Sequence, residues 1–288
     1  MKKYRTYKYK SDIISIFIES NSERFINMLS KIIDIYEIDI KTLIQNEMQK
    51  IRVCTFGNFY NFYFFVYDEI QISERAITIS RVINNILGIL DYYFNNSSLI
   101  SFHASSVFFN KNLIMFMNKS GNGKTTALCN LLFRFEDSLF ISDDRVLISP
   151  DLKLYGINNS ISLKKGTKTM LKLDEVSLSK CLKKNSKKIW FLKPTNKFTS
   201  PIILNKQKNY IIIINYNPNV DFNIKPIEGT DMIKNLISNC YNISTRKEEC
   251  LQLFLKIKQY ITMFSITYSN NKKFLSFIKE LGAQSEIS

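Results

Sequence analysis

The run from Asn118 to Thr126, NKSGNGKTT, constrains the fold of this chain more than any other stretch. Two of only eight glycines lie here, Gly121 and Gly123, directly before a Lys-Thr pair. From Gly121 onward the run fits the end of the phosphate-loop pattern GxxxxGK[ST]. The preceding LIMFM predicts a buried strand, and the following TTALCNLLF predicts the start of a helix. A strand, a tight loop and a helix in this order predict an α/β fold.

The residue types of this loop suit the phosphates of a nucleotide. Several backbone N–H groups must point at the phosphate oxygens, and glycine lets the backbone curl closely enough to do so. The helix that follows adds unpaired N–H donors and a positive dipole end. We expect Lys124 to bridge the β- and γ-phosphates and the Thr125 hydroxyl to bind Mg²⁺. The predicted nucleotide-binding residues are Ser120, Gly121, Asn122, Gly123, Lys124, Thr125 and Thr126.

Asn118 stands where the phosphate-loop pattern has its first glycine. Asparagine is the non-glycine residue that best tolerates left-handed backbone, so we expect the loop to keep its shape with Asn118 in that conformation. On this expectation Asn118→Gly is tolerated or improves nucleotide affinity. The alternative to a phosphate site is a glycine-rich turn that arose by chance. Such a turn does not require the strand before it or the helix after it.

Two adjacent carboxylates, Asp143 and Asp144, follow the apolar run LFIS. An acidic strand end after the helix of a phosphate loop is where such proteins carry a magnesium-binding aspartate. Two carboxylates also allow one to hold the metal while the other meets the attacking hydroxyl. The alternative is a solvated Asp-Asp-Arg turn. The single histidine, His103, precedes the strand of the loop and is either a structural residue or a proton-handling one.

The succession FHASSV, NKSGNGKTT and FISDD resembles the catalytic domain of HPr kinase/phosphorylase and its smaller relatives. Those relatives include kinases encoded beside ribosomally made peptides, such as lasso peptides, which they phosphorylate. His103 matches the histidine of the family, residues 120–125 match its loop, and Asp143 with Asp144 match its acidic pair. The stretch ISLKKGT at 161–167 is similar to a basic segment that follows in the relatives.

The resemblance implies an HPr kinase-like P-loop core, a central sheet flanked by helices, behind a smaller N-terminal α+β domain. It implies ATP and Mg²⁺ as cofactors, with His103, Lys124 and Asp143 as catalytic residues. Asp143 would be the base that receives the hydroxyl proton, and Asp144 with Thr125 would hold the metal. The two aspartates could exchange these roles.

The implied activity is transfer of the γ-phosphate to a serine or threonine hydroxyl of a peptide or small protein. One alternative is the bifunctional HPr serine kinase/phosphorylase or a kinase of a small metabolite. The Glu-Arg-Gly-rich segment that supports phosphorylase action in the bifunctional enzymes has no clear counterpart here. A further alternative is a nucleotide-binding regulatory module that transfers no phosphate.

The amino-acid composition indicates which classes of partner the chain favours. The chain carries 40 Lys and Arg against 25 Asp and Glu, a net charge of +15 that favours acidic partners. Because the excess is spread along the chain, a dedicated nucleic-acid site is not favoured. Five cysteines without a CxxC pair argue against zinc and against a disulfide framework. No run reaches the 18 apolar residues of a membrane span, so we expect a cytoplasmic protein without a membrane partner. A homo-oligomer is compatible with the sequence.

The punctuation NNSSL at 95–99 predicts a boundary between an N-terminal α+β domain, residues 1–98, and a P-loop kinase domain, residues 99–288. Before it, hydrophobic periodicity predicts strand structure over 4–19, a helix over 22–38 with Ser22 as N-cap, a strand–turn–strand over 53–66 and a helix over 73–94. After it, the same patterns predict strands at 102–109, 112–117, 138–142, 145–165, 209–216 and 261–268, and helices at 124–135, 229–240, 246–258 and 270–281. The Lys- and Ser-rich stretch 164–197 is a candidate for contact with substrate.

Overall fold

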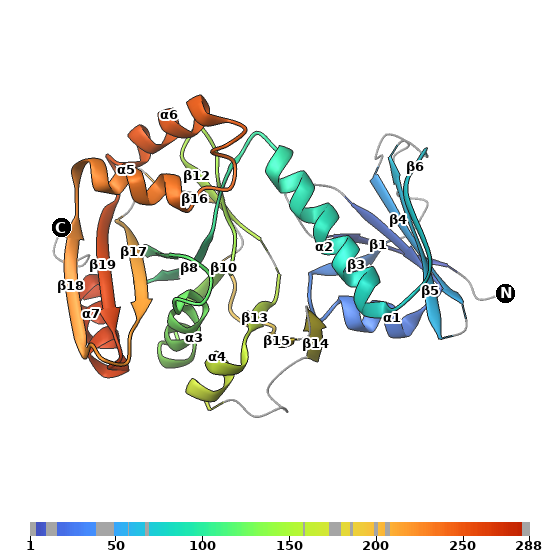
Figure 1. Ribbon diagram of the computed structural model, residues 1–288, viewed down its shortest axis with the longest axis horizontal. Helices are drawn as coiled ribbons and strands as arrows, with labels where there is room; N and C mark the ends of the chain where they lie inside the picture. The colour runs from blue at the N-terminus through green and yellow to red at the C-terminus, as the bar shows by residue number, and fades with distance from the viewer. Residues whose placement is uncertain are drawn as a thin grey trace. The chain divides into compact units, whose positions relative to one another are not determined.

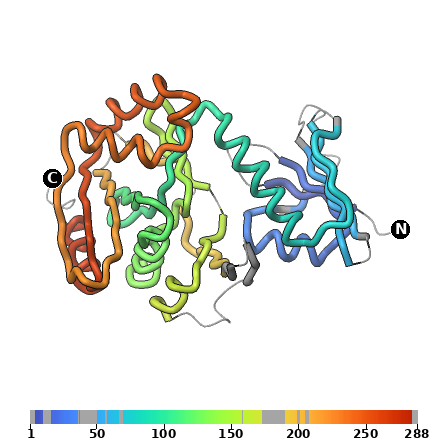
Figure 2. The backbone as a smooth tube through the Cα atoms, in the orientation of Figure 1, coloured from blue at the N-terminus to red at the C-terminus, as the bar shows by residue number. Residues whose placement is uncertain are grey.

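The fold is mixed α/β and divides into two compact units (Figure 1). The computed structural model describes residues 4–9, 16–38, 49–56, 58–66, 69–157, 159–172, 180–184, 187–198, 201–204 and 208–283, and Figure 2 draws the rest of the chain in grey. The first unit comprises Met1–Ser97, Asn158–Ser160 and Leu178–Lys193, and the second comprises Ser98–Ile157, Ile161–Ser177 and Pro194–Ser288. None of the described helices is long and apolar enough to cross a membrane.

The first unit is built on a six-stranded sheet with the order β3-β1-β2-β4-β5-β6, in which β2 and β4 pair in parallel and the other neighbours pair antiparallel. Its strands are β1 (Arg5–Tyr9), β2 (Phe17–Ser20), β3 (Ile35–Ile38), β4 (Gln49–Phe56), β5 (Phe59–Val66) and β6 (Glu69–Ile77). The unit also contains α1 (Glu23–Leu29), α2 (Ile79–Asn96) and the hairpin of β14 (Lys180–Lys184) and β15 (Lys187–Leu192). The predicted strand–turn–strand over 53–66 is confirmed as β4 and β5.

The first predicted helix is shorter than expected. Ser22 is its N-cap as predicted, because the Ser22 hydroxyl accepts a hydrogen bond from the backbone N–H of Phe25 at 3.2 Å. The helix ends at Leu29 instead of continuing to residue 38. Residues 35–38, IYEI, form β3, because Ile and Tyr favour strands and the segment pairs antiparallel with β1.

The second predicted helix begins later than expected. Residues 73–77 belong to β6, which pairs with β5, so the predicted start at residue 73 is wrong. Thr78 is the N-cap of α2, and its hydroxyl accepts the N–H of Arg81 at 3.4 Å. The Thr78 hydroxyl satisfies an N–H of the first turn that has no partner within the helix, and the helix begins there.

Two segments that the sequence assigns to the second domain cluster with the first unit, 158–160 and 178–193. The Ser160 hydroxyl donates to the carbonyl of Lys31 at 2.6 Å. The ammonium of Lys193 lies 3.0 Å from a carboxylate oxygen of Asp34. These contacts join residues more than a hundred positions apart, which local periodicity does not reveal.

The second unit contains a six-stranded sheet with the order β10-β8-β9-β17-β19-β18. Its strands are β8 (Ala104–Phe109), β9 (Asn112–Met117), β10 (Leu139–Ser142), β17 (Asn209–Tyr216), β18 (Phe222–Ile227) and β19 (Thr262–Tyr268). The three central strands β9, β17 and β19 run parallel. The run NYIIIINY is thereby confirmed as a buried central strand. The edge strand β18 is not predicted, since its Pro226 disfavours a strand except at an edge.

Helices cover both faces of this sheet (Figure 1). Met115 and Met117 of β9 pack in one hydrophobic cluster with Phe254 of α6. Phe116, on the opposite face of β9, lies 6.1 Å between ring centroids from Phe274 of α7. The helices of the unit are α3 (Lys124–Arg134), α4 (Lys165–Met170), α5 (Gly229–Ser238), α6 (Lys247–Ile257) and α7 (Asn271–Ala283).

A smaller antiparallel sheet, β16-β12-β11-β7, completes the second unit. The predicted strand 102–109 is split at His103 into β7 and β8, which belong to different sheets. His103 therefore lies at the point where the chain passes from one sheet to the other. The remaining strands are β7 (Ile100–Phe102), β11 (Val146–Ile148), β12 (Lys153–Gly156), β13 (Ile161–Leu163) and β16 (Ile202–Ile203).

Candidate active site

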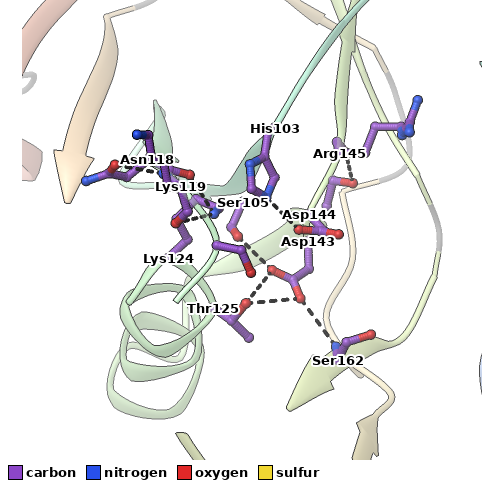
Figure 3. A network of polar contacts seen from close by, with 12 residues as sticks. His103, Ser105, Asn118, Lys119, Lys124, Thr125, Asp143, Asp144, Arg145 and Ser162 are labelled. Carbon is purple, nitrogen blue, oxygen red and sulfur yellow. Dashed lines mark hydrogen bonds and ion pairs between the residues drawn. The ribbon is translucent and has the colours of Figure 1, made fainter. Parts of the chain in front are cut away.

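The predicted phosphate loop joins the buried strand β9 to α3, in the order that its sequence indicates (Figure 3). Gly121 and Gly123 have φ angles of 99° and 100°, in the left-handed region that favours glycine. Gly123 is the N-cap of α3 and no side chain caps the helix there. The first N–H groups of α3 are thus left for a ligand, as a bound phosphate requires.

Lys124 turns back over this loop and is almost fully buried. Its ammonium donates to the carbonyl of Asn118 at 2.8 Å and to that of Lys119 at 3.3 Å (Figure 3). Burial lowers the pKa of the Lys124 ammonium, an effect that the carboxylates of Asp144 and Asp143 oppose. The positive charge of Lys124 is therefore held inside the loop with two acidic groups nearby.

Asp143 is the centre of a network of donors (Figure 3). Its carboxylate accepts hydrogen bonds from the Ser105 hydroxyl at 2.6 Å, from the Thr125 hydroxyl at 3.1 Å and from the backbone N–H of Ser162 at 3.3 Å. Burial and the neighbouring Asp144 raise the pKa of the Asp143 carboxyl, and these three hydrogen bonds oppose the rise. Asp143 is fixed beside the hydroxyl of the loop threonine.

Asp144 has different surroundings from Asp143. Its side chain is 73% exposed, and its carboxylate lies 2.9 Å from Nε2 of His103. The hydrogen bond with His103 is the main cause that lowers the pKa of the Asp144 carboxyl, and Lys124 and Lys164 lower it further. Asp144 adopts φ of 68°, a strained backbone for a non-glycine residue, which turns the two neighbouring carboxylates to different partners.

His103 is held on two sides. Its backbone N–H donates to the carbonyl of Asn239 at 2.7 Å. Its ring lies 5.6 Å from the ring of Tyr241, centroid to centroid. The guanidinium of Arg145 lies over the Tyr241 ring, 4.5 Å from its centroid. The imidazole is therefore oriented by the fold toward Asp144.

A basic segment contacts the loop from the other direction. The Lys164 ammonium donates to the Ser120 hydroxyl at 2.7 Å. The hydroxyls of Thr126 and Thr167 lie 2.9 Å apart, which ties α4 to the first turn of α3. Lys164 also adds positive charge near Lys124 and lowers its pKa. The ammonium groups of Lys124 and Lys164 thus both lie at the loop. Only Lys124 is among the predicted site residues.

The expectation that Asn118 adopts left-handed backbone is wrong. Asn118 is not among the residues with positive φ, so no left-handed backbone is required at this position. Its side chain has a structural task instead: the amide donates to the carbonyl of Ile214 at 2.9 Å and accepts the N–H of Lys119 at 2.7 Å. Asn118 thereby ties the start of the loop to the neighbouring strand β17.

The structure brings the predicted catalytic residues His103, Lys124 and Asp143 to one site, together with Thr125 and Asp144. The loop threonine contacts Asp143, whereas the resemblance pairs it with Asp144 as a metal ligand. Ser105 was not predicted. Its contact with Asp143 joins residues 38 positions apart, so no local pattern of the sequence indicates it.

The oxygen atoms at Asp143 suit the binding of a magnesium ion. Mg²⁺ prefers oxygen ligands and is commonly held by one or two protein side chains together with substrate phosphates. The Thr125 hydroxyl and the Asp143 carboxylate are two such oxygens in direct contact. In the part of the chain that the structure describes, no group of three or more His, Cys, Asp or Glu side chains could hold a metal.

Comparison with known proteins assigns no family to this chain. No protein-family model matches it, and no curated protein matches it.

Proposed function

We propose that this protein is an ATP- and Mg²⁺-dependent kinase that transfers the γ-phosphate to a serine or threonine hydroxyl of a peptide or small protein. The observation that carries the proposal is the hydrogen bond of the Thr125 hydroxyl to Asp143, beside Lys124 and the exposed carboxylate of Asp144. A structural glycine turn requires none of these side chains. Phosphoryl transfer requires a phosphate cradle, a metal ligand and a proton acceptor together.

An HPr kinase-like P-loop core is part of the proposal. It is supported by the order of the histidine, the loop and the acidic pair along the chain and by the parallel pairing of the loop strand β9 with β17. We also place the protein in the cytoplasm. The described cysteines Cys54, Cys129, Cys240 and Cys250 are free thiols, which suits a reducing compartment.

The phosphate side of the site is assigned to the loop and its two lysines. Backbone N–H groups of residues 120–126 would surround the phosphate oxygens, with Lys124 and Lys164 supplying positive charge. Thr125 and Asp143 would hold Mg²⁺. When bound, the ion supplies charge that neutralises the β- and γ-phosphates. These residues act mainly by positioning and by electrostatic stabilisation.

The acceptor side is assigned to Asp144 and His103. The oxygens of Asp143 already accept three hydrogen bonds, whereas the Asp144 carboxylate is exposed and has His103 as its partner. Asp144 would accept the proton of the attacking hydroxyl as the oxygen–phosphorus bond forms, and His103 would orient the carboxylate. This assignment exchanges the roles that the resemblance gives to Asp143 and Asp144.

The acceptor is proposed to be a peptide because the surface beside the loop is basic and open. Lys164 and Lys165 are exposed at the start of α4, next to the site. Exposed lysines favour an acidic chain segment over a neutral metabolite. The bifunctional HPr enzyme and a silent nucleotide-binding module are the alternatives that the experiment below separates. A kinase of a small metabolite is a third alternative.

Mass spectrometry tests the function directly. Serine- and threonine-containing peptides, acidic and neutral, are incubated with the protein, ATP and Mg²⁺, and the masses are searched for an added phosphate. We expect phosphate on an acidic peptide, and none without Mg²⁺ or with Lys124→Ala. Binding of ATP without transfer to any acceptor would favour the regulatory module. Release of phosphate from phosphoserine protein would favour the bifunctional enzyme.

A further inference from the structure

Tyr216 and Tyr268 lie at the carboxyl ends of two parallel strands beside the loop strand. In the sheet, β9 lies between β8 and β17. Beyond β8 lies β10, which the acidic pair follows, and beyond β17 lies β19. Ligands of α/β proteins bind beyond the carboxyl ends of parallel strands. With its phosphates on the loop and its reacting end toward Asp144, a nucleotide would extend its other end toward β17 and β19.

Tyr216 contacts the loop directly. Its backbone N–H donates to the carbonyl of Asn122 at 3.2 Å. Its Cβ lies 3.5 Å from the place that a Cβ on Gly123 would take. Tyr216 is nevertheless 41% exposed. A partly exposed tyrosine therefore has its backbone and Cβ against the loop of the proposed phosphate site.

The ring of Tyr216 has a rigid support. It meets the ring of Tyr268 edge-on, at 6.0 Å between centroids and an interplanar angle of 86°. Tyr268 is fully buried and stacks on Phe274 of α7 at 4.7 Å. The following loop is fixed as well, because Asn217 donates its N–H to the carbonyl of Tyr268 at 3.0 Å.

We propose that the exposed ring of Tyr216 is the stacking platform for the nucleobase of the bound triphosphate. The inference rests on the proposed phosphate site and adds the subsite for the base. Aromatic stacking accepts any base, because every base has a π-face. The platform therefore does not distinguish adenine from guanine.

Calorimetric titrations with ATP, GTP and inorganic tripolyphosphate, each with Mg²⁺, separate the base from the phosphates. We expect Tyr216→Ala to weaken the binding of ATP and GTP by roughly 10-fold, as the loss of one base–aromatic stack predicts. The affinity for tripolyphosphate should be unchanged, since it has no base. Tyr216→Phe should retain the affinity for ATP. Tyr260→Ala, at another half-exposed tyrosine, is the control that should alter neither ligand.

Each other outcome contradicts the base platform in a recognisable way. Equal weakening of ATP and tripolyphosphate in Tyr216→Ala would mean that the residue only supports the loop. Unchanged affinity for ATP in that variant would remove Tyr216 from the site while leaving the phosphate loop in place. Failure of the unaltered protein to bind either ligand would overturn the proposed function and the platform together.

Discussion

The two large sheets of this protein are buried in different ways, and the difference indicates where a ligand binds. In the first unit, β5 alternates between buried residues such as Phe62 and Phe64 and partly exposed ones such as Tyr63 and Phe65. In the second unit all six residues of β9 are buried. Antiparallel sheets often face water on one side, whereas central parallel strands are covered on both faces.

This difference determines where polar side chains occur. In the first unit they lie along the strand faces, as where Glu19 pairs with Lys50 and Arg52 at 2.9 Å. In the second unit β9 is apolar from Leu113 to Met117, and most polar groups of the site lie beyond the strand ends. The loop after β9 and the acidic pair after β10 are the result. A polar cluster beyond the ends of buried strands is therefore a stronger candidate for a functional site than an ion pair within a sheet.

The largest expected effects come from truncating one buried ring in each unit. Phe62→Ala and Phe116→Ala each remove a fully buried side chain, which should cost about 3–5 kcal/mol in free energy of unfolding. Chemical denaturation with ATP binding as a second readout distinguishes them. We expect Phe62→Ala to spare ATP binding and Phe116→Ala, two residues before the loop, to reduce it. Loss of ATP binding in both would contradict the assignment of the site to the second unit alone.

Lys124→Ala should lower the rate of phosphate transfer by roughly 10²–10³-fold, because it removes a preorganised charge facing the phosphates. It should weaken ATP binding as well. Steady-state kinetics and titration measure the two effects. Lys279→Ala, an exposed lysine on α7, is the matched control and should match the unaltered protein. Normal turnover in Lys124→Ala would show that the loop binds no phosphate.

Lys164→Ala tests whether the basic segment belongs to the site. A charge-assisted hydrogen bond to phosphate is worth roughly 10-fold to 100-fold, which is the expected fall in kcat/KM. Lys165→Ala is the comparison, because it removes one exposed charge from the same surface and should lower kcat/KM less than Lys164→Ala. Equal effects of the two substitutions would mean that Lys164 acts only through the general charge of the surface.

Asn118 provides the smallest and most specific effect. Asn118→Ala should cost about 1 kcal/mol in stability through the lost hydrogen bond to Ile214, and Asn118→Gly should cost more through added chain flexibility. Thermal unfolding of the two variants compares them. A glycine variant more stable than the alanine variant would show that the position needs left-handed backbone after all.

The sequence predicts the parts of this protein that depend on local chemistry. The strand, loop and helix around Gly121 and Gly123, the central strand β17 and the N-cap at Ser22 all follow from short patterns. The ends of the first two helices do not, because the runs at 35–38 and 73–77 pair with strands distant from the helix pattern. Tertiary pairing overrides periodicity at such places.

The site shows the same limit. Residue types and order indicate which side chains carry chemistry, but they do not determine which of two adjacent carboxylates meets Thr125. That choice depends on the positive φ of Asp144, which turns its carboxylate to His103 and leaves Asp143 to Thr125. Ser105 and Lys164 join the site through contacts that span 38 and 44 residues. Contacts at such separations have no local signature in the sequence.

A magnesium titration of the transfer rate tests the division of roles between the two carboxylates most directly. Asp143→Asn should weaken the metal site, so raised Mg²⁺ should partly restore its rate. Asp144→Asn keeps the shape of the side chain but cannot accept the hydroxyl proton, so raised Mg²⁺ should restore nothing. Rescue of Asp144→Asn alone would contradict the assignment and reverse the two roles. Near-normal rates in both variants would contradict the proposal that this site transfers phosphate.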